Sequence, residues 1–150
     1  MSEPVRISPV RPEDREEWLG LWRGYTRFYE TDVPAEVTAA TFERITGPGE
    51  ELHGAIARDA DGTAVGLVHW LTHPATWTTT DYCYLEDLFV SPDARGGRIG
   101  EALIAHVRDW ASEHGSSKVY WLTAETNATA RRLYDRVAAH SGFVQYQIAL

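Results

Sequence analysis

The chain has 150 residues, the usual size of one compact domain, and we expect a single domain that spans residues 1–150. Its formal net charge of −8 argues against nucleic-acid binding, which needs a basic face. An acidic protein would attract a cationic substrate, although a charge that only maintains solubility is the simpler interpretation. The single cysteine, Cys83, excludes an intrachain disulfide, and the sequence has no signal peptide and no bilayer-spanning apolar stretch, so we expect a soluble protein of the cytoplasm with no membrane partner.

The first half of the chain predicts a strand, two helices and a hairpin. Residues 5–7 form a short strand, and Pro12 with the acids after it begins a helix. The large apolar residues of this helix recur at helical spacing: Trp18, Leu21, Trp22 and Tyr25. A second helix covers residues 35–44. Residues 52–58 and 64–71 are strand-like and enclose a turn at 59–62, which predicts a hairpin, and a loop follows at 73–77.

The second half alternates strands with helices. Residues 82–90 are the strongest strand, a loop covers 91–97, and a helix covers 99–113 before Gly115. Residues 118–123 form the next strand, and Thr126 or Asn127 caps a helix that runs to about residue 139. Gly142 then precedes a last strand at 143–148. This order predicts an α/β (or α+β) domain with three layers around a mixed sheet.

The glycine-rich loop between residues 95 and 100 is a candidate anion site. Gly96, Gly97 and Gly100 let backbone N–H groups approach an anion, and the following helix adds its positive dipole end. Arg95 and Arg98 add charge and forked donors. The nucleotide P-loop and dinucleotide fingerprints are both absent, so from the loop alone an anion site and a plain turn remain equally open.

The surrounding residues resemble the GNAT superfamily of acetyltransferases. The loop is similar to its motif A, Gln/Arg-x-x-Gly-x-Gly/Ala, with Arg95 first, Gly100 last and Arg98 in place of the middle glycine. Residues 84–90 look like the spermidine/spermine and thialysine branch. Residues 120–127 and 131–134 look like the later strand–helix motif of the family, including acetyltransferases described as acting on histones and polyamines.

The resemblance implies a GNAT-like fold with a mixed, mostly antiparallel central sheet, in which a splayed pair of parallel strands binds acetyl-CoA. Side chains and backbone of two strand–helix units would then contact the cofactor. These are Leu88, Phe89, Val90, Arg95, Gly96, Gly97, Arg98, Ile99, Gly100, Glu101, Asn127 and Ala130.

The resemblance also implies the catalytic roles. Tyr134 matches the family tyrosine that faces the cofactor sulfur and can protonate the leaving thiolate. Glu86 matches an acid on the acceptor side that can take the proton of the amine. Its neighbour on the strand, Asp87, should point to the opposite face unless a bulge intervenes. Tyr84 and Leu88 should share the face of Glu86. The expected acceptor-side residues are Tyr25, Phe28, Tyr29, Trp77 and Glu86.

The leading interpretation is an enzyme that acetylates a primary amine on a small, cationic molecule by direct transfer in a ternary complex. No metal motif is present, and we expect no metal. Protein-lysine acetylation and a non-catalytic acyl-CoA-binding module remain alternatives. Homodimers are frequent in the family, so we expect a homodimer in which a second subunit pairs with the strand at 143–148.

Overall fold

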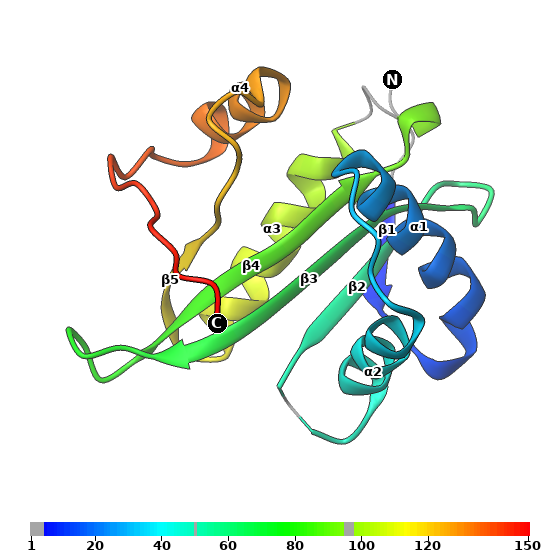
Figure 1. Ribbon diagram of the computed structural model, residues 1–150, viewed down its shortest axis with the longest axis horizontal. Helices are drawn as coiled ribbons and strands as arrows, with labels where there is room; N and C mark the ends of the chain where they lie inside the picture. The colour runs from blue at the N-terminus through cyan, green and yellow to red at the C-terminus, as the bar shows by residue number, and fades with distance from the viewer. Residues whose placement is uncertain (1–4, 50, 95–97) are drawn as a thin grey trace.

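The computed structural model describes residues 5–49, 51–94 and 98–150 (Figure 1). Its sheet contains β1 (Arg6–Pro9), β2 (His53–Arg58), β3 (Ala64–Pro74), β4 (Asp81–Val90) and β5 (Ser116–Tyr120). The strands lie in the sheet in chain order, and neighbours are antiparallel except for the parallel pair β4 and β5. This confirms the expected mixed, mostly antiparallel sheet.

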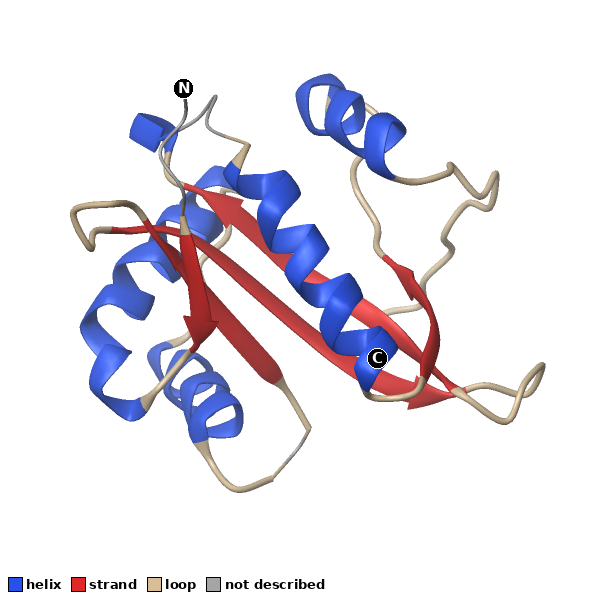
Figure 2. Ribbon diagram, turned by 180° about the vertical axis from the view of Figure 1, so that it is seen from behind, coloured by secondary structure: helices blue, strands red, loops and turns tan. Residues whose placement is uncertain are grey.

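Helices cover both faces of the sheet. The 3₁₀ turn η1 (Pro12–Asp14) leads into α1 (Arg15–Phe28), which lies with α2 (Ala35–Thr46) on one face (Figure 1). The view from behind shows α3 (Ile99–Glu113) across the opposite face (Figure 2), and it follows the 3₁₀ turn η2 (Pro92–Ala94). The last helix, α4 (Ala128–Val137), lies beyond β5. The domain therefore has the expected three layers.

Each face of the sheet has its own apolar core. Trp18 and Leu21 of α1 are buried against Ile56 and Leu67, whereas Leu103 of α3 belongs to a cluster on the other face with Val68 and Cys83. The buried positions of α3 recur at helical spacing: Ile99, Leu103, Val107 and Ala111. The apolar residues at helical spacing thus form the faces through which α1 and α3 pack on the sheet.

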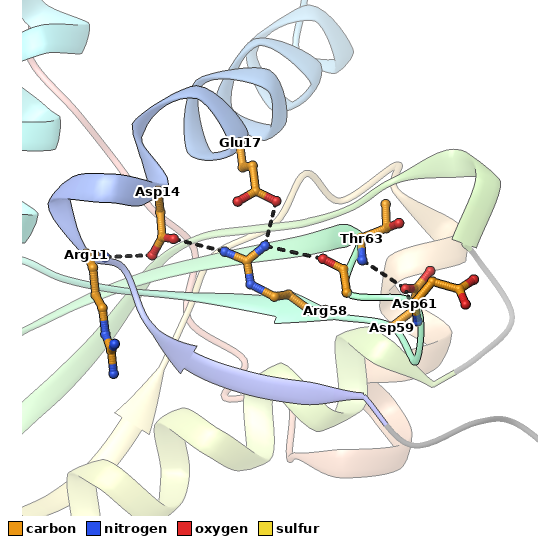
Figure 3. A network of polar contacts seen from close by, with 8 residues as sticks. Arg11, Asp14, Glu17, Arg58, Asp59, Asp61 and Thr63 are labelled. Carbon is orange, nitrogen blue, oxygen red and sulfur yellow. Dashed lines mark hydrogen bonds and ion pairs between the residues drawn. The ribbon is translucent and has the colours of Figure 1, made fainter.

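An arginine network fixes the start of α1 to the end of β2 (Figure 3). The guanidinium of Arg58 donates to Asp14 Oδ1 at 3.0 Å and to Glu17 Oε2 at 2.5 Å. The hydrogen bond that Arg58 donates to Glu17 is the largest cause of the raised pKa of Arg58. The other oxygen of Asp14 accepts the backbone N–H of Arg11 at 2.8 Å. The carboxylate of Asp14 therefore caps the turn η1 and also binds Arg58 of β2.

The parallel pair of strands separates partway along β4. Residues Asp81 to Tyr84 pair with β5 up to Tyr120, but β4 continues to Val90 beside β3 while the chain after Tyr120 turns away toward α4 (Figure 1). In the described residues, the second half of β4 therefore has no parallel neighbour. This is the splayed pair that the sequence predicts.

The main differences from the sequence prediction concern three strands. The expected strand at 143–148 is wrong for the single chain: the residues after Val137 form no strand in the structure, and Phe143 and Tyr146 are 88% and 91% exposed. A strand needs a hydrogen-bonded partner, and this segment pairs with no strand of the sheet that the structure describes, although β5 has a neighbour on one side only. β3 runs on to Pro74 because it pairs with Asp81 of β4, and β5 ends at Tyr120 rather than at residue 123.

Among the described residues, no helix is long and apolar enough to cross a membrane.

Candidate active site

A cavity of about 460 Å³ lies where α1, β4, α3 and α4 meet. Most of its lining coincides with residues that the sequence analysis selected: Tyr25, Phe28, Tyr29, Leu88, Phe89, Val90, Arg98, Ile99, Gly100, Glu101, Asn127, Ala130 and Tyr134. The lining residues that it missed are Ala94, Thr129, Leu133 and Arg136. Three selected residues, Arg95, Gly96 and Gly97, lie outside the described residues.

One end of the cavity is the N-terminus of α3. Arg98 precedes the helix with φ 59° and ψ 27°, the left-handed conformation that the family glycine would adopt without strain. The side chain of Arg98 does not cap this end of α3, and in the part of the chain that the structure describes the first-turn N–H groups are available to an anion. A Cβ on Gly100 would lie 3.2 Å from Leu133, so glycine lets α3 and α4 approach closely.

Two arginines flank a carboxylate at this end. Glu101 Oε2 lies 3.6 Å from Arg98 Nη1 and 3.2 Å from Arg136 Nη2. The Arg98 side chain is 74% exposed, so it can turn toward a ligand at little cost. Arg136 escaped the sequence analysis because α4 brings it to Glu101 from 35 residues away, and helical spacing alone does not predict that contact.

The other wall contains Tyr134 on α4. Its ring packs edge-on against Trp121 at 5.4 Å, and burial raises the pKa of its hydroxyl, with a smaller contribution from Tyr29. The phenol is therefore protonated at neutral pH and can donate. Asn127 caps the same helix, since its Oδ1 accepts the N–H of Ala130 at 3.4 Å, as predicted from the sequence.

A β-bulge at Glu86 changes which side chains face the site. Asp87 pairs with His69 and Leu85 with Trp70, so Glu86 is the extra residue between them. Leu88 packs with the core under α3, so the expectation that it shares the face of Tyr84 and Glu86 is wrong. Burial and then the charge of Asp87 raise the pKa of Glu86, and a hydrogen bond from Tyr84 opposes them.

Aromatic rings line the cavity beside the bulge. Tyr25 lies 5.0 Å from Tyr29 and 6.3 Å from Phe89 between ring centroids, and Phe28 lies 5.2 Å from Tyr29. The pKa of Tyr25 is raised by its burial, by the charge of Asp87 and by a hydrogen bond to that carboxylate. The structure does not bring Trp77 to this wall, because its side chain is 93% exposed in the loop between β3 and β4.

Behind the bulge lies a buried polar pair that the sequence analysis missed. His69 is 2% exposed; its Nδ1 lies 2.9 Å from Asp87 Oδ2, and Trp18 Nε1 donates to its Nε2 at 3.0 Å. Residues 18, 69 and 87 share no short motif, so no sequence signal joins them. Within the ranges that the structure covers, no group of three or more His, Cys, Asp or Glu could hold a metal ion.

The chain matches known proteins over nearly its whole length. The family model described as Acetyltransferase (GNAT) family matches residues 16–139. The chain is 36% identical to the D-amino-acid N-acetyltransferase HPA3 of Saccharomyces cerevisiae over 148 residues, which cover 98% of this chain and 92% of that protein. An uncharacterized N-acetyltransferase of Schizosaccharomyces pombe is 29% identical, over 87% of this chain and 79% of the relative.

Solved structures agree with the fold. A ribosomal-protein-alanine N-acetyltransferase from Brucella melitensis biovar Abortus 2308 superposes with a TM-score of 0.81 at 25% identity, covering 98% of this chain and 100% of the other. The aminoglycoside N-acetyltransferase AAC(6')-Iy in complex with CoA gives a TM-score of 0.85 at 21% identity, over 99% and 97% of the two chains. HPA3 is named for D-amino acids, so the expected kinship with the polyamine and histone branch is not supported. The chain belongs to the GNAT acetyltransferase family, and it is an acetyl-CoA-dependent N-acetyltransferase.

Proposed function

We propose that this enzyme acetylates the primary amine of a small molecule that enters between Tyr25, Tyr29 and Glu86. The observation that carries the proposal is the hydrogen bond between Tyr25, which lines the cavity, and Asp87 beside the bulge. Glu86 is exposed and does not line the cavity itself, but its charge acts on Tyr25. Carboxylates beside aromatic rings suit an ammonium group, through charge and cation–π contacts. A small cationic amine and an amino acid, the substrate class in the name of HPA3, both present such a group.

The cavity fits the cofactor at its arginine end. The uncapped N–H groups of α3, with Arg98 and Arg136 beside them, would bind the pyrophosphate. Leu88, Phe89 and Val90 line the cavity on the unpaired half of β4, where backbone N–H and C=O groups can bind an extended chain. Acetyl-CoA supplies the acetyl thioester to this site.

The two ends of the reaction use different side chains in this proposal. Tyr134, protonated and lining the cavity, donates its proton to the departing thiolate. Glu86 binds the ammonium group of the acceptor and accepts one of its protons, directly or through water, so that the amine can attack. Burial and the charge of Asp87 raise the pKa of Glu86, which makes its carboxylate a stronger base.

A release assay for free CoA thiol tests the proposal across D- and L-amino acids, polyamines, aminoglycosides and lysine peptides. We expect turnover with at least one small amine and, for Tyr134→Phe, a fall in kcat of roughly 100-fold or more with intact acetyl-CoA binding. Tyr82→Phe is the matched control, since Tyr82 lies outside the cavity and loses the same hydroxyl while its ring contact with His73 can remain. Turnover of lysine peptides alone would favour protein acetylation. Tight acetyl-CoA binding with no turnover would favour the binding-module alternative.

We further propose that two copies associate through the segment after Val137. Its apolar side chains are exposed in the single chain: Phe143 by 88%, Val144 by 76%, Tyr146 by 91% and Ile148 by 88%. Soluble proteins rarely expose such a run of apolar side chains. A second copy of the chain would pair with this strand-like segment and cover it. Light scattering at micromolar concentration should give a dimer that deletion of residues 143–150 converts to a monomer. A monomeric full-length chain would refute this.

A further inference from the structure

A chain of hydrogen bonds leads from the cavity wall into the core under α1. Tyr25, on the wall, hydrogen-bonds to Asp87; Asp87 Oδ2 lies 2.9 Å from His69 Nδ1; and His69 Nε2 accepts from Trp18 Nε1 at 3.0 Å. Trp18 and His69 are 1% and 2% exposed, and the Asp87 side chain is 16% exposed. Solvent is therefore excluded at Trp18 and His69, and it reaches this chain of hydrogen bonds from the side of Asp87 and Tyr25.

The contact with Trp18 fixes the protonation of His69. An indole N–H can only donate, so His69 Nε2 must be the unprotonated nitrogen that accepts it. The ring proton is then on Nδ1, from which it is donated to Asp87 Oδ2. A second proton would have to occupy Nε2, where the Trp18 N–H already points. His69 thus donates from Nδ1 and holds one oxygen of Asp87 in place.

Tyr25 holds the same carboxylate from the cavity side. Burial and the charge of Asp87 raise its pKa far above the ordinary value, so Tyr25 remains a phenol that donates to Asp87. Its oxygen retains lone pairs, and the residue lines the cavity in which the acceptor would bind. The phenol is therefore placed to accept a proton from one side while releasing its own to the other.

We propose that Tyr25 and Asp87 carry the proton away from the acceptor amine, with His69 and Trp18 as positioning residues. The inference rests on the proposed function. As the amine nitrogen forms its bond to the acetyl carbon and the carbon–sulfur bond breaks, the surplus N–H proton passes to the Tyr25 oxygen. The original Tyr25 proton passes to Asp87, and Tyr134 protonates the thiolate. Asp87 gains one proton and Tyr134 loses one, so charge and protons balance in the transfer. Water then takes the proton from Asp87 and returns one to Tyr134, which restores the enzyme.

The other titratable groups that face this chain come from two elements. Glu86 and Tyr84 lie beside Asp87 on β4, and Tyr29 lies beside Tyr25 just after α1. Glu86 is the alternative proton acceptor, since it also acts on the pKa of Tyr25 through its charge. An experiment must therefore separate the route through Tyr25 from one through Glu86.

Steady-state kinetics can separate these routes. The variants are Tyr25→Phe and Trp18→Phe, and Trp22→Phe is the control. Tyr25→Phe should lower kcat at least roughly tenfold and leave the KM for acetyl-CoA within about threefold of wild type. Trp18→Phe frees His69 Nε2, so the profile of kcat/KM against pH should gain an acidic limb between about pH 5 and 8. Trp22 stacks on Trp18 and donates instead to Thr38, so Trp22→Phe should retain the wild-type profile.

Nitrogen NMR of the wild-type histidines tests the fixed tautomer without any variant that could fail to fold. For His69 we expect a protonated Nδ1 and an unprotonated Nε2 across the same pH range, and a proton on Nε2 would overturn the inference. A second result would also overturn it: an unchanged kcat in Tyr25→Phe, together with loss in Glu86→Gln of the fall in kcat/KM at low pH that a carboxylate base produces. The proton would then leave through Glu86. Absence of turnover by the wild-type enzyme on every amine would instead refute the proposed function.

Discussion

Replacing Arg98 by glycine and by alanine separates a backbone effect from a charge effect at one position. Arg98 has a positive φ of 59°, and a residue with a Cβ in that conformation costs about 1 kcal/mol relative to glycine. Arg98→Gly should therefore be more stable than Arg98→Ala by about 1 kcal/mol. Within an ordinary helix the order is reversed by a similar amount, so the sign of the difference is diagnostic.

Urea unfolding measures that difference directly. With a slope near 2 kcal/mol per molar, about 1 kcal/mol moves the midpoint by roughly 0.5 M, and the melting temperature by about 2–4 °C. Because the Arg98 side chain is 74% exposed, its removal should change few contacts other than the 3.6 Å pair with Glu101. Alanine equal to or more stable than glycine would refute the left-handed conformation of this residue.

The charge effect should be the same in both variants. Each removes one exposed guanidinium from the arginine end of the cavity, so acetyl-CoA should bind roughly two- to fivefold more weakly to both. The loss should shrink as salt is added, because salt screens exposed charges. Calorimetric titration of the two proteins checks this. Wild-type affinity in Arg98→Ala would show that the side chain does not reach the pyrophosphate.

Three further outcomes follow from the structure. Arg58→Met should lower the free energy of unfolding by about 1–3 kcal/mol, measured by urea titration, because it leaves Asp14 and Glu17 without their guanidinium, whereas Arg58→Lys should recover part of the loss. Burial raises the pKa of Cys83 to about 11, so a thiol reagent near neutral pH should label it only after unfolding; rapid labelling of the folded protein would contradict this. The raised pKa of Glu86 means that its ionised form is the less favourable one in the fold, so Glu86→Gln should gain stability relative to wild type as pH rises through that pKa and match it in acid, where both side chains are neutral.

Periodic patterns predicted the elements that bury one face. The apolar residues of α1 and α3 recur at helical spacing, and both helices lie where that spacing places them. Most of the cavity lining was also predicted, because the elements that form it carry recognisable motifs. These features depend on local sequence, so a single chain contains the information.

The bulge and the absence of the final strand could not be predicted, for two different reasons. Glu86 is the extra residue because its neighbours Asp87 and Leu85 pair with His69 and Trp70 on another strand, and the sequence of β4 alone does not contain that register. The residues at 143–148 have the composition of a strand, but a strand forms only when its backbone pairs with a neighbour. Composition predicts the tendency to form a strand, and it does not predict whether that pairing occurs.

Charged side chains in and beside the cavity indicate how acetyl-CoA would lie in the proposed complex. Arg98 and Arg136 lie at the start of α3, where they flank Glu101, and Glu86 and Asp87 lie at the bulge on β4. A pyrophosphate at the bulge would face two carboxylates in a protein whose net charge is already −8, whereas at α3 it would meet two guanidinium groups and N–H donors against the single carboxylate of Glu101. In the proposed complex the thioester end would therefore lie toward the bulge. The carboxylates there would attract the ammonium group of the acceptor, so the charge distribution that orients acetyl-CoA would also bring the amine to the acetyl carbon.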